Sequence, residues 1–145
     1  MLKSPANQMP SDHPCPCGRL GRSNKPQPYA DCCGRYLDDF DNTPAPDAES
    51  LMRSRYSAFV LGREAYLRAT WHASCRPANV APDPGTKWLG LDVRRHAALD
   101  ADHAEVEFVA RYRPATGSGP AARIHERSRF VREHGRWYYV DGDLL

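Results

Sequence analysis

Residues 103–113, HAEVEFVARYR, form the stretch that decides the fold. Its apolar side chains occupy every second position and share one face of an extended chain: Ala104, Val106, Phe108, Ala110 and Tyr112. Such alternation of apolar and polar residues is typical of a β-strand with one face on a core and the other in solvent. The segment is therefore predicted to be a strand.

Three other segments repeat this period of two. They are residues 87–97 (KWLGLDVRRHA), 122–132 (ARIHERSRFVR) and 135–141 (GRWYYVD). The first is expected to place Leu89, Leu91 and Val93 on one face. Residues 114–120, PATGSGP, are typical of a hairpin loop. The sequence thus predicts a four-stranded antiparallel sheet.

Helical signals precede the sheet. Asp47 is expected to cap a helix over residues 48–61, and Gly62 is expected to end it. A second short helix is predicted over residues 64–71, and prolines then exclude regular structure as far as about residue 85. Two helices followed by an antiparallel sheet make an α+β domain.

Four of the five cysteines lie within nineteen positions, in the segments HPCPCG (13–18) and YADCCG (29–34). Zn²⁺ takes four tetrahedral ligands, with thiolate sulfur at about 2.3 Å. A Cys-x-Cys pair can supply two from one tight turn. The adjacent pair can supply two more if its backbone is turn-like or helical, because neighbouring residues of a strand point opposite ways. The predicted ligands of one structural zinc ion are Cys15, Cys17, Cys32 and Cys33, which leave no open position for catalysis.

The first ~40 residues hold few large apolar side chains, so this segment is expected to be disordered, docked on the main body or held by a metal. Three other interpretations of the cysteines stay open. Disulfides would need an oxidising compartment, a redox pair would lack the usual Cys-x-x-Cys spacing, and His13 could replace one cysteine as a ligand. Cys75 stands alone and is expected to be a bystander.

Location and charge narrow the classes of function. No apolar run approaches the roughly 20 residues that cross a bilayer, and residues 1–8 lack the apolar centre of a secretory signal. We therefore expect a cytoplasmic protein without membrane contact. The net charge of +2 is too small to indicate nucleic acid by itself.

The cysteine segments resemble the SEC-C motif, a small zinc-binding knuckle. Longer stretches resemble the YchJ-like bacterial proteins, a family that carries this motif: LMRSRYSAFVLG (51–62), AYLRATWH (65–72), WLGL (88–91), VEFVARYR (106–113) and HERSRFVREHGRWYYVDGD (125–143). The resemblance implies an NTF2-like, or cystatin-like, fold in which packed helices and a curved sheet enclose a cup. It also implies the same four cysteine ligands and a protein partner that docks at the knuckle.

The expected division of the chain has four parts: a disordered lead (1–14), an SEC-C-like zinc knuckle (15–36), a linker (37–46) and an NTF2-like domain (47–145). The knuckle departs from the motif in one respect. Fourteen residues separate Cys17 from Cys32, more than the motif usually has, although a longer loop costs only a fraction of a kcal/mol in closure entropy. We expect the four ligands to be retained and the surface around them to differ.

Glu126 and Ser128 are expected on the apolar face of their strand, where a carboxylate is costly unless it is paired. Three arrangements stay open. Arg53 or Arg55 forms a buried ion pair with Glu126, a bulge turns Glu126 outward, or Glu126 lines a polar cavity. The candidate pocket residues are Glu126, Ser128, Tyr56, Tyr66, His72, Trp88, Arg53 and Arg55. His72 could instead cap a helix C-terminus.

The other face of the sheet is expected to be solvated and of mixed charge. Glu107 is predicted to pair with Arg129 across two strands. The alternative is a surface for phosphate or acidic groups, built from Arg123, Arg127 and Arg129.

Three functions remain as hypotheses. The leading one is a zinc knuckle that docks another macromolecule, a protein in the first instance. The second is a small-molecule-binding or enzymatic cup, with Glu126 and His72 as acid–base candidates. The third is association with RNA or the ribosome through Arg19, Arg22 and Arg35. No nucleophile–base set, phosphate loop or dinucleotide fingerprint is visible, so no catalytic residue is predicted and an enzyme is less favoured.

Overall fold

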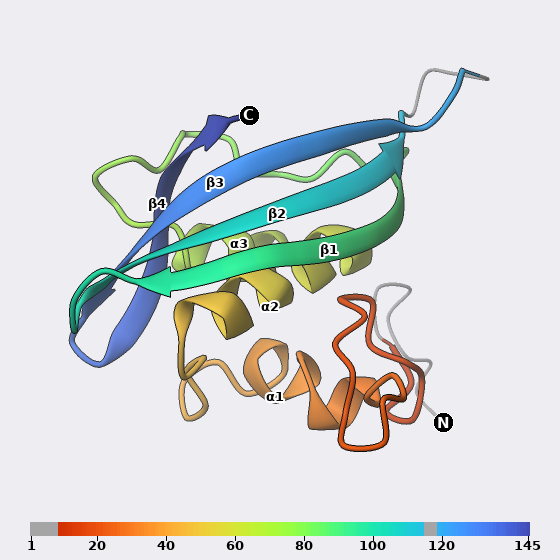
Figure 1. Ribbon diagram of the computed structural model, residues 1–145, viewed down its shortest axis with the longest axis horizontal. Helices are drawn as coiled ribbons and strands as arrows, with labels where there is room; N and C mark the ends of the chain where they lie inside the picture. The colour runs from red at the N-terminus through yellow and green to blue at the C-terminus, as the bar shows by residue number, and fades with distance from the viewer. Residues whose placement is uncertain (1–8, 115–118) are drawn as a thin grey trace.

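The computed structural model describes residues 9–114 and 119–145. A four-stranded sheet curves over two helices, and the cysteine-bearing N-terminal segment lies beside them (Figure 1). In chain order the elements are the 3-10 helix η1 (Tyr29–Asp31), the helices α1 (Gly34–Leu37), α2 (Ala48–Leu61) and α3 (Glu64–Ala69), and the strands β1 (Lys87–Ala98), β2 (His103–Arg113), β3 (Ala122–Glu133) and β4 (Arg136–Leu144). The predicted α+β architecture is confirmed.

The sheet is an antiparallel meander with the strand order β1-β2-β3-β4. In the β2–β3 hairpin, Glu107 lies opposite Arg127 and not opposite Arg129, two positions from the predicted register. An even shift leaves every side chain on its expected face, so Glu126 and Ser128 still lie on the core side. The loop sets the register, and residues 115–118 of the predicted loop lie outside the described residues.

A bulge in β1 changes which side chains reach the core. The pairing of β1 with β2 shifts between Trp88 and Gly90, so Trp88 packs on the core and Leu89 remains 38% exposed. The prediction that Leu89 shares the core face with Leu91 and Val93 is therefore wrong. An extra residue on one strand reverses the alternation locally.

α2 begins and ends where the sequence predicts. The Asp47 carboxylate accepts a hydrogen bond from the Ser50 backbone N–H at 2.7 Å, which satisfies one free donor of the first turn. Gly62 has a φ of 71°, a left-handed conformation that a glycine adopts without strain. The helix crosses the concave side of the sheet and contacts β1, β2 and β4 (Figure 1).

Residues 37–46, expected as a linker, are fixed to the domain. Leu37 and Ala45 are buried. Arg136, at the start of β4, donates to the backbone oxygens of Phe40 at 2.7 Å and Asp41 at 2.8 Å. Its guanidinium also lies 4.3 Å from the centre of the Phe40 ring. These contacts hold the segment that joins the two predicted parts of the chain.

Only part of the predicted disordered lead can be described, because residues 1–8 lie outside the described residues. Within residues 9–14, the His13 oxygen accepts from the Tyr29 N–H at 2.7 Å and the Ser11 oxygen accepts from the Ala30 N–H at 3.1 Å.

Among the helices of the described residues, none has the length and apolar character needed to cross a membrane.

Candidate metal centre and cavity

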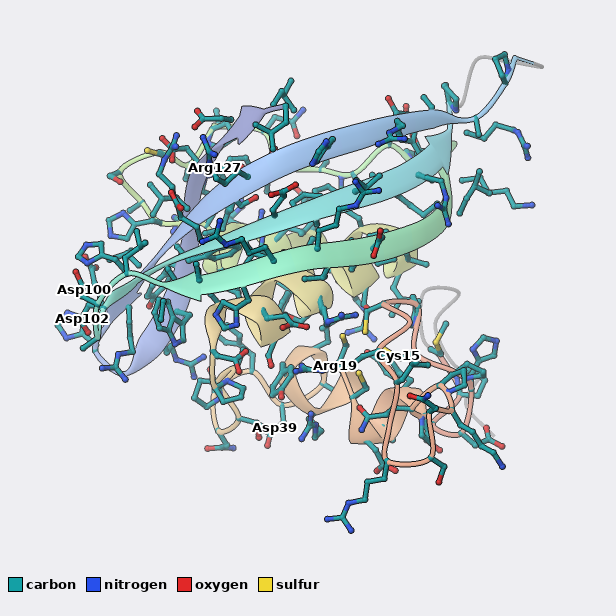
Figure 2. All side chains as sticks on the ribbon, viewed as in Figure 1. Cys15, Arg19, Asp39, Asp100, Asp102 and Arg127 are labelled. Atoms are coloured by element: carbon teal, nitrogen blue, oxygen red, sulfur yellow. The ribbon has the colours of Figure 1, made fainter. Side chains whose placement is uncertain are left out.

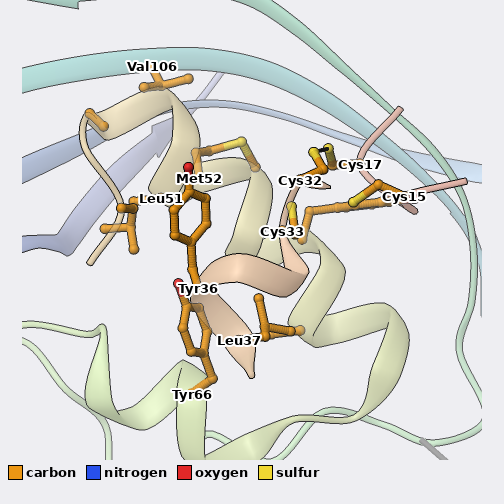
Figure 3. Close-up of a cluster of buried hydrophobic side chains, with 14 of the residues drawn as sticks. Cys15, Cys17, Cys32, Cys33, Tyr36, Leu37, Leu51, Met52, Tyr66 and Val106 are labelled. Atoms are coloured by element: carbon orange, nitrogen blue, oxygen red, sulfur yellow. Dashed lines mark hydrogen bonds between the residues drawn. The ribbon is translucent and has the colours of Figure 1, made fainter. Parts of the chain in front are cut away.

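The four predicted ligand cysteines converge at one buried point. Their sulfur atoms all lie within 4.8 Å of one another, and Figure 3 shows them together above α1. A tetrahedral site with metal–sulfur bonds of about 2.3 Å separates its sulfurs by about 3.8 Å. The Sγ atoms of Cys17 and Cys32 are 3.6 Å apart, which fits this geometry. The described residues therefore form a set that could hold one metal ion.

Local backbone features bring the two cysteine pairs together. Gly18 has a φ of 74° and donates its N–H to the Cys15 oxygen at 3.1 Å, which closes the first turn. Cys33 has helical φ and ψ angles and is the N-cap residue of α1, as the argument from adjacent cysteines requires. The next residue is a glycine, Gly34, because a Cβ at this position would lie only 2.7 Å from the backbone oxygen of Tyr29.

Hydrogen bonds join this centre to α2. The Cys15 sulfur lies 3.6 Å from the Ser57 hydroxyl, and Arg53 donates to the backbone oxygen of Cys17 at 3.1 Å. Arg19 donates to the Ser50 hydroxyl at 3.0 Å, and Figure 2 shows it extending from the knuckle beside Cys15. The centre is thus built into the domain.

The sulfur atoms also influence one another. Hydrogen bonds from the thiols of Cys17, Cys32 and Cys33 lower the pKa of Cys15. Hydrogen bonds with Cys15 and Cys17 raise the pKa of Cys32 and of Cys33, so the four thiols do not release their protons equally readily. The thiolate is the form that binds metal.

The other cysteine interpretations find no support in the geometry. All five cysteines are free. His13 is exposed, its Nδ1 lies 2.9 Å from the Pro14 oxygen, and it is not among the clustered groups. Cys75 is exposed in the segment that follows α3, where its sulfur accepts a hydrogen bond from the Ser74 hydroxyl at 3.7 Å.

The long interval between Cys17 and Cys32 folds as a small hairpin. The Gly21 N–H donates to the Lys25 oxygen at 2.7 Å, and the Gln27 N–H donates to the Arg19 oxygen at 3.1 Å. This hairpin, residues 19–27, carries Leu20 with 52% of its surface exposed. The additional residues therefore extend the surface and leave the cysteine cluster intact.

A cavity of about 230 Å³ lies between α2 and the concave face of the sheet. Most of its lining is apolar and aromatic. The lining residues are Met52, Arg55, Tyr56, Phe59, Trp71, Trp88, Phe108, Ala110, Ile124, Glu126, Ser128, Phe130 and Tyr139. Five of the eight candidate pocket residues are among them: Arg55, Tyr56, Trp88, Glu126 and Ser128.

Glu126 faces this cavity without a cationic partner. Its Oε2 accepts from the hydroxyls of Ser128 and, at 3.1 Å, of Tyr139. The expected ion pair with Arg53 or Arg55 is absent among the described residues, and no bulge occurs at this position. Arg53 instead binds Glu49 at 2.8 Å.

Arg55 is a buried cation at the same cavity. One nitrogen, Nη1, donates to the Leu67 oxygen at 2.8 Å and to the Thr70 hydroxyl at 2.7 Å. The guanidinium lies 5.2 Å from the centre of the Trp71 ring and 4.8 Å from that of Tyr139. Burial lowers the pKa of Arg55 to about 10, so the group keeps its charge at neutral pH.

The remaining candidates lie elsewhere. The Tyr66 hydroxyl is 2.7 Å from that of Ser54, on the side of α2 that faces α3. His72 lies beyond the end of α3, where its ring nitrogens bond Glu133 at 3.0 Å and Ser74 at 2.7 Å. It therefore neither caps the helix nor meets Glu126 in the cavity.

The other eight lining residues were not predicted as pocket residues, and Trp71 and Tyr139 are the two of them that contact Arg55. Alternation along β4 could have placed Tyr139 on the core face. Nothing local could have placed Trp71, because its position depends on a bridge to Tyr139 from the far end of the chain.

The charged outer face of the sheet is largely paired. Arg129 binds Asp141 at 2.6 Å and Asp143 at 2.8 Å, and Arg127 lies 3.6 Å from Asp143. Glu107 binds His125 at 2.8 Å, which replaces the predicted Glu107–Arg129 pair. These ion pairs fit the expected face of mixed charge, and they do not favour the alternative of an anion-binding surface at Arg127 and Arg129, because β4 brings two carboxylates beside them.

A curved antiparallel sheet that encloses helices and a cavity defines an NTF2-like domain, here joined to a four-cysteine knuckle. The family model described as "YchJ, middle NTF2-like domain" matches residues 47–142. The chain belongs to the YchJ family.

Relatives and solved structures agree with this assignment. A UPF0225 protein of Polaromonas sp. is 72% identical over 129 residues, which are 89% of this chain and 91% of that protein. A UPF0225 protein of Methylibium petroleiphilum is 58% identical over 132 residues, 90% of this chain and 88% of that protein.

Two solved structures of SEC-C motif containing proteins are similar along most of their length. The crystal structure from Psychrobacter arcticus has a TM-score of 0.73 and 33% identity, and the match covers 93% of this chain and 84% of that one. The solution structure from Rhodopseudomonas palustris has a TM-score of 0.75 and 32% identity, covering 92% and 99%.

Proposed function

We propose that this protein binds a small molecule in its NTF2-like cup and holds one structural zinc ion in its knuckle. The observation that carries the first part is the cavity of about 230 Å³, with aromatic walls and two ionisable groups that do not pair with each other. Ligand sites are mostly apolar hollows with a few convergent polar groups. If this region were only part of the hydrophobic core, side chains would be expected to fill it, because protein interiors are close-packed.

Benzene tests whether the cup accepts a ligand, since a cavity of about 150 Å³ is enough to hold it. A ligand that binds only the folded chain raises the melting temperature. We expect benzene to stabilise the wild type and Ala98→Leu, a control at an exposed position. Ala110→Leu places extra atoms in the cavity and should abolish the shift. No shift in the wild type would contradict the proposal.

Zinc is proposed for the knuckle because four cysteine thiolates are its typical structural ligands, and the four sulfurs lie within 4.8 Å of one another. Metal analysis of protein purified under reducing conditions should give one zinc per chain. Cys17→Ser should lose most of this metal, whereas Cys75→Ser should keep it. Substantially less than one equivalent in the wild type would overturn the assignment.

A second function, docking of a macromolecule at the knuckle, is favoured by the exposed side chain of Leu20. This residue belongs to the 19–27 hairpin, and two basic residues, Arg19 and Arg22, lie close to it in the sequence. Protein interfaces combine an apolar centre with a polar rim, which an exposed leucine next to arginines could supply.

Affinity capture can test this docking with variants that leave the cysteines intact. We expect Leu20→Asp to lose a partner that is retained by the wild type and by Leu99→Asp, a control that alters another exposed leucine, on the β1–β2 turn. Identical capture by all three would exclude the hairpin as the docking site. Release of the partner by nuclease would instead support the hypothesis of RNA or the ribosome.

A further inference from the structure

The cavity contains one cation and one anion that are not in contact. Arg55 is buried at 6% exposure, whereas Glu126 is half-buried. Tyr139 lies between them, with its ring 4.8 Å from the Arg55 guanidinium and its hydroxyl 3.1 Å from Glu126. The two charges therefore face the same space from two positions.

Arg55 has hydrogen-bond donors to spare. A guanidinium carries five N–H groups, and the two hydrogen bonds to Leu67 and Thr70 both start from Nη1. Its Nε and Nη2 bond no described residue. Within the described part of the chain, no fully buried side-chain nitrogen or oxygen lacks a partner. The spare donors of Arg55 are therefore not fully buried, and Arg55 lines the cavity from which a ligand can reach them.

Glu126 has a spare acceptor in the same space. Oε2 accepts from Ser128 and Tyr139, whereas Oε1 accepts from no described residue. A ligand that fills the cavity can thus accept from Arg55 and donate to Glu126.

Charge balance restricts the ligand further. The charges of Arg55 and Glu126 cancel, so a ligand with a net charge would leave one uncompensated charge in a largely apolar site, which is costly. A wholly apolar ligand would leave the spare donors of Arg55 and the Oε1 atom of Glu126 without partners. The walls, among them Phe59, Phe108 and Phe130, suit an apolar body of about one ring.

We propose that the cavity binds a small zwitterion with an apolar body, namely an α-amino acid with an apolar side chain. Its carboxylate accepts from Arg55, and its ammonium group donates to Glu126. This inference rests on the proposed ligand-binding function of the cup.

Calorimetric titration with matched compounds tests the inference. L-Phenylalanine is compared with 3-phenylpropionate, which lacks the ammonium group, and 2-phenylethylamine, which lacks the carboxylate. L-Leucine, 4-methylpentanoate and 3-methylbutylamine form a second, smaller set. In at least one set the amino acid should bind ten-fold or more tightly than both analogues. Equal binding of the three compounds in both sets would overturn the inference.

A substitution at Glu126 adds a second readout. Glu126→Gln removes the charge while keeping the shape, and should reduce the preference for the amino acid over the carboxylate analogue at least ten-fold. Glu105→Gln, on the opposite face of the sheet, should leave the preference unchanged. An unchanged preference in Glu126→Gln would contradict the assignment of the ammonium group.

Benzene separates the two proposals. If benzene stabilises the protein and no compound of either set binds, the zwitterion inference fails and the cup remains a ligand site. If benzene and both sets all fail to bind, the proposed function fails with it.

Discussion

Glu126 can fold back along the sheet because Gly142, its diagonal neighbour on β4, has no side chain. Gly142 lies opposite Ser128, and a Cβ at position 142 would collide with the Glu126 carboxylate. The carboxylate occupies this space while it accepts from Ser128 and Tyr139. Gly142 is therefore part of what positions the anion of the cavity.

Replacing Gly142 should be destabilising for this steric reason. Gly142→Ala is expected to lower the free energy of unfolding by about 1–3 kcal/mol, the usual cost of overpacking. Urea denaturation measures this change in the free energy of unfolding. In a Glu126→Ala background the same replacement should cost much less, because the colliding group is gone. The same cost in both backgrounds would exclude the steric explanation.

At the scale of single residues, the sequence predicted which kind of side chain lies on the core face, but not which side chains it contacts. An acidic residue on the core face was recognisable from the alternation in β3. Its partners were not, because Arg53 and Arg55 differ by about 200° around a helix. The docking of α2 decides that Arg53 binds the knuckle and that Arg55 faces the cavity. Such docking depends on contacts far apart in the sequence.

At the scale of elements, β3 and β4 are joined by an ion-pair ladder on their outer face. A hydrogen bond from Arg129, with a smaller contribution from Arg127, lowers the pKa of Asp143 below its ordinary value of 3.8. A carboxyl group with a lowered pKa in the folded state stabilises the protein above the unfolded pKa. This stabilisation is lost as the pH falls through the folded pKa.

Asp143→Asn should therefore lower the melting temperature at neutral pH, and the difference from the wild type should shrink as the pH falls below about 4. Thermal melts across this range measure the difference. Asp12→Asn serves as a control, because Asp12 makes no ion pair with the described residues. A difference that is independent of pH would show that the ladder does not depend on the charge of Asp143.

Element positions were predictable because their signals are local. The cap at Asp47, the stop at Gly62 and the alternation in β2 all lie within the elements that they define. The register of the β2–β3 hairpin and the bulge at Leu89 were not predictable. Both depend on which residues of the neighbouring strand form the backbone hydrogen bonds. A shift of two residues leaves the same side chains on each face, so the alternation of apolar and polar residues cannot reveal it.

For the whole molecule, the main feature is one core shared by the knuckle and the domain. The four cysteines belong to the same buried cluster as side chains of α2 and the sheet, including Leu51 and Val106 (Figure 3). The resemblance to SEC-C proteins predicted the two parts of the chain. It did not predict their interface, which is made by scattered side chains such as Arg19 and Ser57.

Removal of the proposed zinc should therefore destabilise the entire chain. A ligand at 1,000 times its dissociation constant stabilises a protein by about 4 kcal/mol, so chelation is expected to cost at least about this amount. Calorimetry should show a single transition that moves to lower temperature. Cys75→Ser, as a control, should melt like the wild type. A second transition whose temperature is the same with and without the chelator would mean that the domain folds independently of the knuckle.

Ten of the fourteen residues of α2 are buried, because one side of the helix supports the cysteines and the other closes the cavity. Such a helix has little surface on which random substitution is harmless. A saturation mutagenesis scan should therefore show α2 as a continuous band of intolerance, while the loops and the outer face of the sheet accept most replacements. Sequence changes during evolution would therefore be confined to the loops and the outer face of the sheet, and the sequence of α2 would change little.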